Sequence, residues 1–175
     1  MEAVECCPRI ISREEWNARE PRSVRRIPPV KHVFIHHTAT GRCDSQVSCS
    51  ASMRSIQNFH MDSNGWNDIG YNFLIGGDGN IYEGRGWNVE GAHTRGFNRN
   101  GIAISFIGNY QEQDAPSDMI EAAKKLIKCG VNKGYIVKKY QLHGHRDANP
   151  TLCPGNKLYK QISSWKNFVK GPLRK

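Results

Sequence analysis

The run Ile-Ala-Ile-Ser-Phe-Ile-Gly at residues 102–108 is the sequence feature that most restricts how this chain can fold. A half-exposed strand alternates apolar and polar residues, whereas a nearly continuous apolar run is typical of a strand buried on both faces. Such a strand needs other elements packed over both sides of its sheet. The sequence therefore predicts an α/β fold.

Shorter runs of β-branched and aromatic residues supply further strands for this sheet. Residues 31–37 and 140–145 each read as a strand. Two apolar runs on either side of a Gly-Asp-Gly turn predict a hairpin over residues 71–84. Together with residues 102–108, these segments predict a central mixed β-sheet of about five strands.

Apolar residues at helical spacing predict amphipathic helices over residues 46–62, 117–131 and 155–168. We therefore expect a single α/β domain in which about three helices flank the sheet. Residues 1–30 contain several prolines and frequent arginines, so we expect them to form an N-terminal surface segment of the same domain.

The charge of the chain restricts its partners. The formal net charge of +9 attracts polyanions, which include nucleic acid, anionic lipid and the phosphate-rich polymers of bacterial envelopes. No block of five or more like charges and no nucleic-acid-binding motif is visible, so nucleic acid is not expected as a partner. No apolar run approaches the ~18 residues of a membrane-spanning helix, so no membrane span is expected.

Two histidines and a cysteine are candidate metal ligands. His36 and His37 end the strand at residues 31–37, and only one of them can point into a given site because neighbouring strand residues face opposite ways. His145 and Cys153 are joined by a short loop that contains a proline. Two His and one Cys suit zinc and leave a fourth position for water, the pattern of catalytic sites. Such a zinc ion would lower the pKa of the water toward about 7 and polarise a carbonyl.

Spacing alone leaves other interpretations of these residues open. Each histidine could be an ordinary core or surface residue, and Cys153 could be a buried thiol or half of a disulfide. Cys43 and Cys49 have a spacing that a local disulfide could close, although both could also be free thiols in a cytosolic protein. The first residues lack the basic start and apolar stretch of a secretory signal, so either the protein is cytosolic or a signal has been removed.

Several long motifs occur in a familiar order along the chain. They are Phe-Ile-His-His-Thr-Ala-Thr from residue 34, the segment Gly-Trp-Asn-Asp-Ile-Gly-Tyr through Glu-Gly-Ala-His at 65–93, residues 101–110, and Leu-His-Gly-His-Arg-Asp through Asn-Lys-Leu-Tyr at 142–159. Together they resemble the peptidoglycan recognition proteins, relatives of the phage-type N-acetylmuramoyl-L-alanine amidases. The match runs from about Cys6 to Phe168, and the short secreted forms with a Cys-Cys start look closest. The resemblance implies that residues 31–170 form a peptidoglycan recognition/amidase domain of a secreted protein.

The resemblance assigns roles to five residues. The zinc ligands of the family fall on His36, on His145 in Gly-His-Arg, and on Cys153 in Cys-Pro-Gly. The catalytic tyrosine matches Tyr71, and the residue that assists two positions before the cysteine matches Thr151. Family members that only bind cell wall typically lack the cysteine, so Cys153 favours an enzyme over a receptor.

The implied activity is hydrolysis of bacterial peptidoglycan with Zn²⁺ as cofactor, as part of innate immunity. The bond cut is the amide between the lactyl group of N-acetylmuramic acid and L-Ala. The alternative is a non-catalytic peptidoglycan receptor or bactericidal binding protein that uses the same groove.

The resemblance also implies a binding groove. Tryptophans offer flat faces to sugars or peptides, an arginine can clamp a carboxylate, and the remaining side chains can hydrogen-bond to amides and hydroxyls. The residues expected to contact substrate are His37, Thr38, Trp66, Arg85, Gly86, Trp87, His93 and Asn98. The alternative for each tryptophan is core packing. In the family, a Gly-Trp pair after this arginine accompanies a preference for diaminopimelate-type stems, so Gly86 and Trp87 predict that preference.

The cysteine pattern of the family carries over to two disulfides, Cys43–Cys49 and Cys7–Cys129. Asn67 stands where a partner for a third bridge of vertebrate short forms would be, so Cys6 is left over. An odd thiol can form an intermolecular link, and we expect a monomer or a weak dimer joined through Cys6. Disulfides also indicate an oxidising compartment.

Overall fold

A computed structural model describes residues 7–175 of the chain, and the expected link through Cys6 lies outside the described residues. Its centre is a six-stranded mixed sheet with the order β1-β4-β3-β5-β2-β6, in which only β3 and β4 pair antiparallel. The strands are β1 (Ile10–Ile11), β2 (Val30–His37), β3 (Phe73–Ile75), β4 (Ile81–Glu83), β5 (Gly101–Phe106) and β6 (Ile136–Gly144). Every residue of β5 is buried, which agrees with its continuous apolar sequence.

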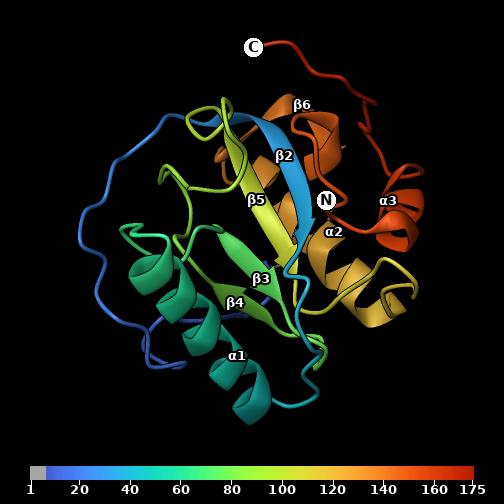
Figure 1. The fold of residues 1–175 in the computed structure, drawn as a ribbon. Coiled ribbons are helices and arrows are strands. Elements are labelled where there is room, and N and C mark those ends of the chain that lie inside the picture. The colour runs from blue at the N-terminus through green and yellow to red at the C-terminus, as the bar shows by residue number, and fades with distance from the viewer. Residues whose placement is uncertain (1–6) are drawn as a thin grey trace, which may run out of the picture.

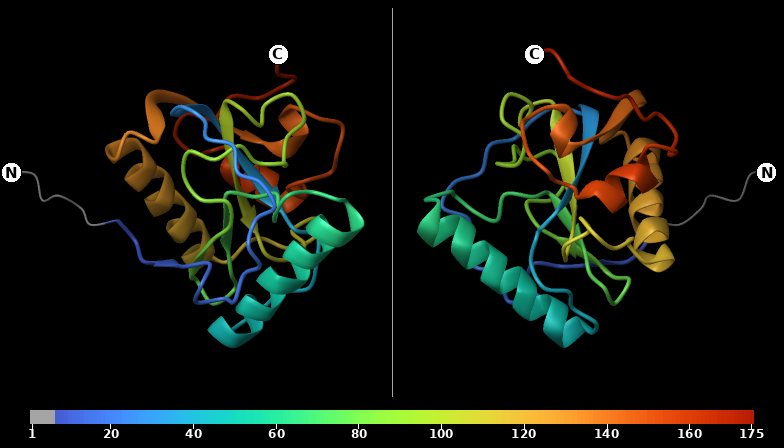
Figure 2. Two further views of the ribbon diagram at one scale, coloured as in Figure 1. Left: turned by 90° about the vertical axis from the view of Figure 1, so that its left-hand side faces the viewer. Right: turned by 45° about the vertical axis from the view of Figure 1, so that its right-hand side comes forward.

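Three α-helices cover the two faces of the sheet (Figures 1 and 2). They are α1 (Gln46–Asn58), α2 (Ser117–Asn132) and α3 (Asn156–Ile162), and two short turns, η1 (Phe59–Ser63) and η2 (His145–Asp147), follow α1 and β6. The predicted α/β class and three-helix count are confirmed. The sheet has one more strand than the sequence predicted, because the two residues of β1 are too few to show a periodicity.

The last helix is shorter than the predicted 155–168. It ends at Ile162, where the hydroxyls of Ser163 and Ser164 donate to carbonyls of the final turn, at Lys160 and Gln161, and so compete with helix continuation. The apolar stripe that prompted the prediction is nevertheless buried, since Trp165 packs in the core beyond the end of the helix.

Side chains alternate between the two faces of the sheet along the central strands, and they pack into two separate hydrophobic clusters. Val33 and Ile35 of β2 join α2 and α3 in one hydrophobic core, while Leu74 of β3 and Tyr82 of β4 pack with α1 in another. His36 directly follows Ile35 in β2, so its side chain faces the opposite side of the sheet, the α1 side. Helix α1 covers only part of that side, which leaves space over β2 for a site.

The N-terminal segment contributes to the core as well as to the surface. β1 pairs parallel to β4, and Ile11 and Trp16 are buried in the cluster beneath α1. The indole Nε1 of Trp16 donates to the carbonyl of Glu83, 2.8 Å away. Residues in the range 7–30 therefore include buried structural side chains in addition to exposed ones.

Both expected disulfides are present. Cys43 and Cys49 are bonded at the start of α1, and Cys7 is bonded to Cys129 in α2, which ties the N-terminal segment to a helix 122 residues away. Within residues 7–175, no helix is long and apolar enough to cross a membrane.

Replacing Trp16 with Ala should lower the free energy of unfolding by about 3–5 kcal/mol, because the substitution leaves a cavity and an unpaired carbonyl. Urea denaturation followed by circular dichroism measures this loss. The matched control is Val24→Ala, at an exposed position of the same segment, which should change stability by less than about 0.5 kcal/mol. Equal effects for the two variants would show that the segment does not contribute to the core.

Candidate metal centre

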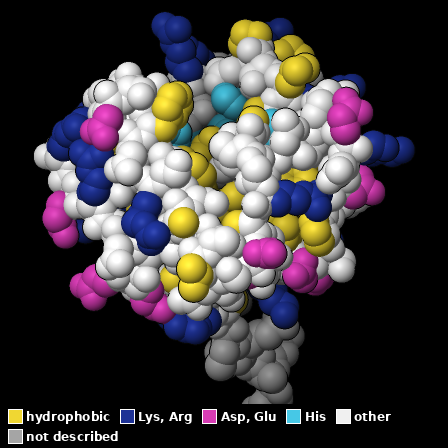
Figure 3. Space-filling view, turned by 60° about the horizontal axis from the view of Figure 1, so that its bottom comes forward, with side chains coloured by type: hydrophobic (Ala, Val, Ile, Leu, Met, Phe, Trp, Pro, Cys, Tyr) yellow, Lys and Arg dark blue, Asp and Glu magenta, His cyan; other side chains and the backbone are white. Residues whose placement is uncertain are grey.

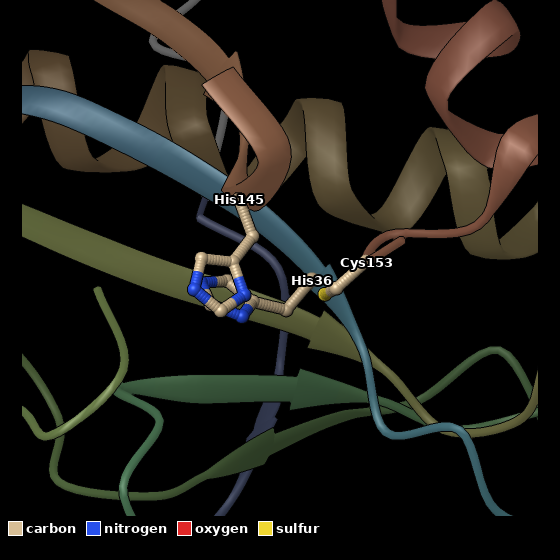
Figure 4. Close-up of side chains that lie close together, drawn as sticks. All are labelled: His36, His145 and Cys153. Atoms are coloured by element: carbon tan, nitrogen blue, oxygen red, sulfur yellow. The ribbon is translucent and has the colours of Figure 1, made fainter. Parts of the chain in front are cut away.

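Parallel pairing brings His36 and His145 together. In the register of β2 and β6, Ile35 lies opposite Gly144, so the next residue of each chain segment is a histidine. His36 is the penultimate residue of β2, and His145 begins the turn that follows β6. The centroids of the two imidazole rings are 4.2 Å apart, and Figure 4 shows the rings overlapping.

Cys153 reaches the same place from the loop that follows β6. The backbone N–H of Arg146 donates to the Cys153 carbonyl over 3.0 Å, which closes this loop on itself. The backbone N–H of His37 donates to the sulfur over 3.4 Å. Cys153 is in no disulfide, and one ligand atom from each of His36, His145 and Cys153 lies within 4.8 Å of the others.

Burial controls the protonation of these three groups. It lowers the pKa of His36 well below its ordinary value, aided by the neighbouring His145, and it also lowers the pKa of His145 itself. Both imidazoles are therefore neutral at pH 7 and offer lone pairs. Burial raises the pKa of the Cys153 thiol to about 12, so a thiolate here needs a cation beside it.

The donor set fits zinc. Two neutral imidazoles and a cysteine sulfur are ligands that zinc prefers, and three protein ligands leave a fourth position open. The Nε2 atom of His145 lies 3.0 Å from Oδ1 of Asn149, and Nε2 of His36 lies 3.1 Å from Oγ1 of Thr94. Each histidine thus has an outer hydrogen-bond partner on one ring nitrogen, as metal-binding histidines usually have.

A pocket of about 530 Å³ opens over this cluster. Figure 3 shows histidine side chains gathered in a hollow of this face beside apolar side chains. The lining residues are His36, His37, Ala39, His60, Trp66, Tyr71, Ala92, His93, Asn109, Gln111, His145, Thr151, Leu152 and Cys153. The pocket therefore collects the three candidate ligands, both candidate catalytic residues and three of the eight expected substrate contacts.

Tyr71 and Thr151 take different positions in the pocket. The ring of Tyr71 lies 5.4 Å from that of His36, and burial raises the pKa of its hydroxyl above the ordinary value. Tyr71 is consequently a neutral hydrogen-bond donor throughout the physiological pH range. The Oγ1 atom of Thr151 accepts from the backbone N–H of Cys153 over 3.2 Å, which helps to hold the cysteine loop.

The Arg85–Trp87 segment lies outside this pocket. All three of its residues line a separate cavity of about 230 Å³. The Nε of Arg85 donates to the carbonyl of Ile69 over 2.7 Å, and the ring of Trp87 packs between Phe73 and Tyr135. Substrate contact by this segment remains a prediction, as does the diaminopimelate preference drawn from it.

Thr38 and Asn98 also do not line the pocket, and both are engaged in loop structure. The side-chain oxygen of Asn98 accepts from the backbone N–H groups of His93 and Thr94, at 2.9 Å each. The hydroxyl of Thr38 accepts from the N–H of Gly108 over 2.9 Å. Asn98 therefore shapes the loop that carries His93.

Sequence reasoning missed several lining residues, of which His60 is the most informative. It lies in η1, a π-helical turn that extends α1, and its Nδ1 accepts from the N–H of Gly70 over 2.8 Å. Burial lowers its pKa to about 4. Its place at the end of the apolar stripe of α1 was visible in the sequence, but that stripe indicated packing and gave no sign of a site. Asn109, Gln111 and Leu152 carried no signal either.

Comparisons with known proteins agree with this site. The family model of N-acetylmuramoyl-L-alanine amidases matches residues 26–156. Peptidoglycan-recognition protein SC2 of Drosophila melanogaster is 48% identical over 160 residues, which cover 91% of this chain and 87% of that protein.

Solved structures give the same result. The wild-type structure of Drosophila PGRP-LB matches with a TM-score of 0.91 at 48% identity, covering 92% of this chain and 96% of that chain. A Tyr-to-Phe variant of the same protein, in complex with tracheal cytotoxin, matches with a TM-score of 0.91 at 47% identity and the same coverage. This chain belongs to the peptidoglycan recognition proteins of the N-acetylmuramoyl-L-alanine amidase family.

Proposed function

We propose that this protein is a zinc-dependent N-acetylmuramoyl-L-alanine amidase that binds bacterial peptidoglycan and hydrolyses the amide between the lactyl group and L-Ala. The observation that carries the proposal is the cluster of His36, His145 and an unbridged Cys153, whose ligand atoms lie within 4.8 Å of one another at the floor of a pocket. A protein that only binds cell wall has no need of three converging metal ligands.

The three ligands and their surroundings define the chemistry. A zinc ion held there would supply a water of lowered pKa and would polarise the scissile carbonyl. Tyr71 lines the same pocket, with its ring 5.4 Å from that of His36. Its neutral hydroxyl would donate to the oxygen that gains charge as the amide carbon becomes tetrahedral. Thr151 holds the Cys153 loop through its hydrogen bond to the backbone.

No carboxylate lines the pocket among residues 7–175, and burial lowers the pKa of His37 and His93, which makes them weak bases. Deprotonation of the attacking water therefore depends on the metal site itself. The pKa of His37 is lowered to about 4 and that of His93 to about 3, chiefly by burial, so both are neutral at pH 7. They can hydrogen-bond to substrate without carrying charge.

The shape of the pocket suits a glycan with an attached peptide. Trp66, half-buried, and Leu152, which is 67% exposed, offer apolar surface beside polar Asn109 and Gln111. Sugars and stem peptides present the same mixture of apolar faces and hydrogen-bonding groups. The cytotoxin complex of a 47% identical relative supports binding of a related ligand at this fold.

The two disulfides support a location outside the cell, because such bridges persist in oxidising compartments. We propose that the protein is secreted and acts on bacterial cell wall in innate immunity.

Replacing Cys153 with Ser should abolish amidase activity, since a serine hydroxyl does not ionise to ligate zinc. Outer hydrogen-bond partners of metal ligands typically contribute about 10–100-fold to metal affinity. Loss of a direct ligand should reduce zinc affinity by more than this. The assay incubates peptidoglycan with each protein, with and without a chelator, and detects released stem peptide by mass spectrometry, while elemental analysis measures bound zinc.

Because Cys153 forms no disulfide, the variant should keep its fold and its binding to insoluble peptidoglycan. Full hydrolysis by Cys153→Ser, or chelator-resistant hydrolysis by the unsubstituted protein, would contradict the amidase proposal. Binding without any hydrolysis by the unsubstituted, zinc-loaded protein would identify a peptidoglycan-binding protein instead.

Replacing Tyr71 with Phe should lower kcat by about 10²–10³-fold and leave zinc content and peptidoglycan affinity nearly unchanged, because the hydroxyl acts on charge that develops during reaction. The matched control is Tyr135→Phe, whose ring stacks on Trp87 outside the pocket and which should keep full activity. A Tyr71→Phe variant with unchanged kcat would remove Tyr71 from the reaction.

A further inference from the structure

The buried hydroxyl of Thr94 joins the metal cluster to a histidine outside it. Its Oγ1 lies 3.1 Å from Nε2 of His36 and 2.8 Å from Nδ1 of His93. The side chain of Thr94 is fully buried, so solvent does not compete for these two hydrogen bonds. The three side chains therefore form one continuous hydrogen-bonded chain.

The number of protons on these three side chains restricts which atom donates in each hydrogen bond. A threonine hydroxyl has one proton and two acceptor lone pairs. Among residues 7–175, Oγ1 of Thr94 has no hydrogen-bond partner besides the two imidazoles, so its proton goes to one of them and it accepts from the other. Both imidazoles are buried, and a neutral imidazole carries one proton on one of its two ring nitrogens. Fixing the proton position on one ring consequently fixes it on the other.

Zinc ligation would fix the proton of His36. Its Nε2 is occupied by Thr94, so Nδ1 is the nitrogen left for the ion and the proton must lie on Nε2. A proton there donates to Oγ1 of Thr94, as the second nitrogen of a metal-bound histidine usually donates to an outer partner.

His145 shows the same arrangement independently. Its Nε2 faces Oδ1 of Asn149, and the amide nitrogen of Asn149 donates to the carbonyls of Arg95 and Ala148 over 3.1 and 2.9 Å. Those two acceptors establish which end of the amide is oxygen, and an amide oxygen only accepts. His145 therefore carries its proton on Nε2 and has Nδ1 free, matching the state required of His36.

The hydrogen-bonded series ends at Nε2 of His93, which is then a donor without a partner. If Thr94 accepts from His36, its own proton goes to Nδ1 of His93, and a neutral His93 then carries its proton on Nε2. That Nε2 is buried and has no hydrogen-bond partner among residues 7–175, and the ring lines the pocket with 8% of its residue surface exposed. A buried donor without a partner is unfavourable unless a ligand atom accepts from it.

We propose that Thr94 is a positioning residue that couples the metal site to substrate recognition. With His36 ligating through Nδ1, Thr94 holds His93 as the Nε2-protonated tautomer, which presents an N–H to a carbonyl oxygen of the bound saccharide or peptide. This inference rests on the zinc ligation in the proposed function. It predicts that zinc loading and ligand binding reinforce each other.

The competing arrangement puts the His93 proton on Nδ1, where it is directed at Oγ1 of Thr94. A hydroxyl of Thr94 that accepts from His93 donates to Nε2 of His36. The proton of His36 would then lie on Nδ1 and block ligation. The two arrangements are therefore distinguished by one observable, the tautomer of His93.

Long-range ¹H–¹⁵N spectra of protein labelled with ¹⁵N-histidine report that tautomer directly. We expect zinc-loaded protein to show His93 protonated on Nε2. The isosteric Thr94→Val variant should lose this fixed tautomer, bind zinc about 10–100-fold more weakly and bind a soluble muropeptide more weakly. The matched Thr94→Ser variant keeps a hydroxyl and should restore all three properties.

A zinc-loaded, unsubstituted protein with His93 protonated on Nδ1 would overturn the proposed coupling through Thr94 and leave the amidase proposal standing. Zinc affinity of Thr94→Val equal to that of the unsubstituted protein would also overturn it. Failure of the unsubstituted protein to bind zinc would contradict both the proposed function and the coupling through Thr94. Should Thr94→Val not fold, the tautomer in the unsubstituted and Thr94→Ser proteins decides the question.

Discussion

The parallel pairing of β2 with β6 is the constraint on which the rest of the site depends. It aligns Ile35 with Gly144, so that His36 and His145 leave neighbouring strands at the same edge of the sheet. Side chains alternate faces along a strand, so a slip of one residue in β2 would turn His36 toward the α2 core and expose His37 in its place. Val33 and Ile35 prevent that slip, because both would lose their places in the core.

Desolvation is the second constraint. The pocket holds five buried or largely buried imidazoles and one thiol, and no carboxylate of the described residues lines it. Burial lowers the pKa of each of these histidines and raises that of the Cys153 thiol, so at neutral pH every group is uncharged in the absence of a cation. Neutral ligands that line this pocket can bind a divalent ion without giving up a competing ion pair.

The sequence predicted the fold class and the ligand set for different reasons. The continuous apolar run of β5 and the helical stripes of α1 and α2 fix a layered α/β architecture through general periodicities. The ligand types and their place after strands indicated zinc, but only the family motifs identified which residues meet, because nothing local to residue 36 determines its distance from residue 153.

What the sequence did not predict depends on tertiary packing. The sequence left Trp87 open between contact with sugars and packing in the core, and only the structure shows that its ring stacks on Tyr135 beside α2. His60 looked like the end of a helix stripe, yet a π-helical turn carries it into the pocket. In both cases the residue type was informative and the direction of the side chain was not, because that direction is set by neighbours far away in the sequence.

Arg85 shows how a residue outside the pocket can still determine the geometry inside it. The carboxylate of Asp68 is 4% exposed and pairs with Arg13 over 2.8 Å, while Arg85 donates to the carbonyl of Ile69. These contacts hold the chain at Asp68 and Ile69, just before Tyr71. A buried carboxylate that loses its partner is strongly destabilising, so the N-terminal segment that supplies Arg13 is bound to the site by electrostatics as well as by the packing of Trp16. The backbone that leads to Tyr71 is therefore held by charged groups that lie outside the pocket.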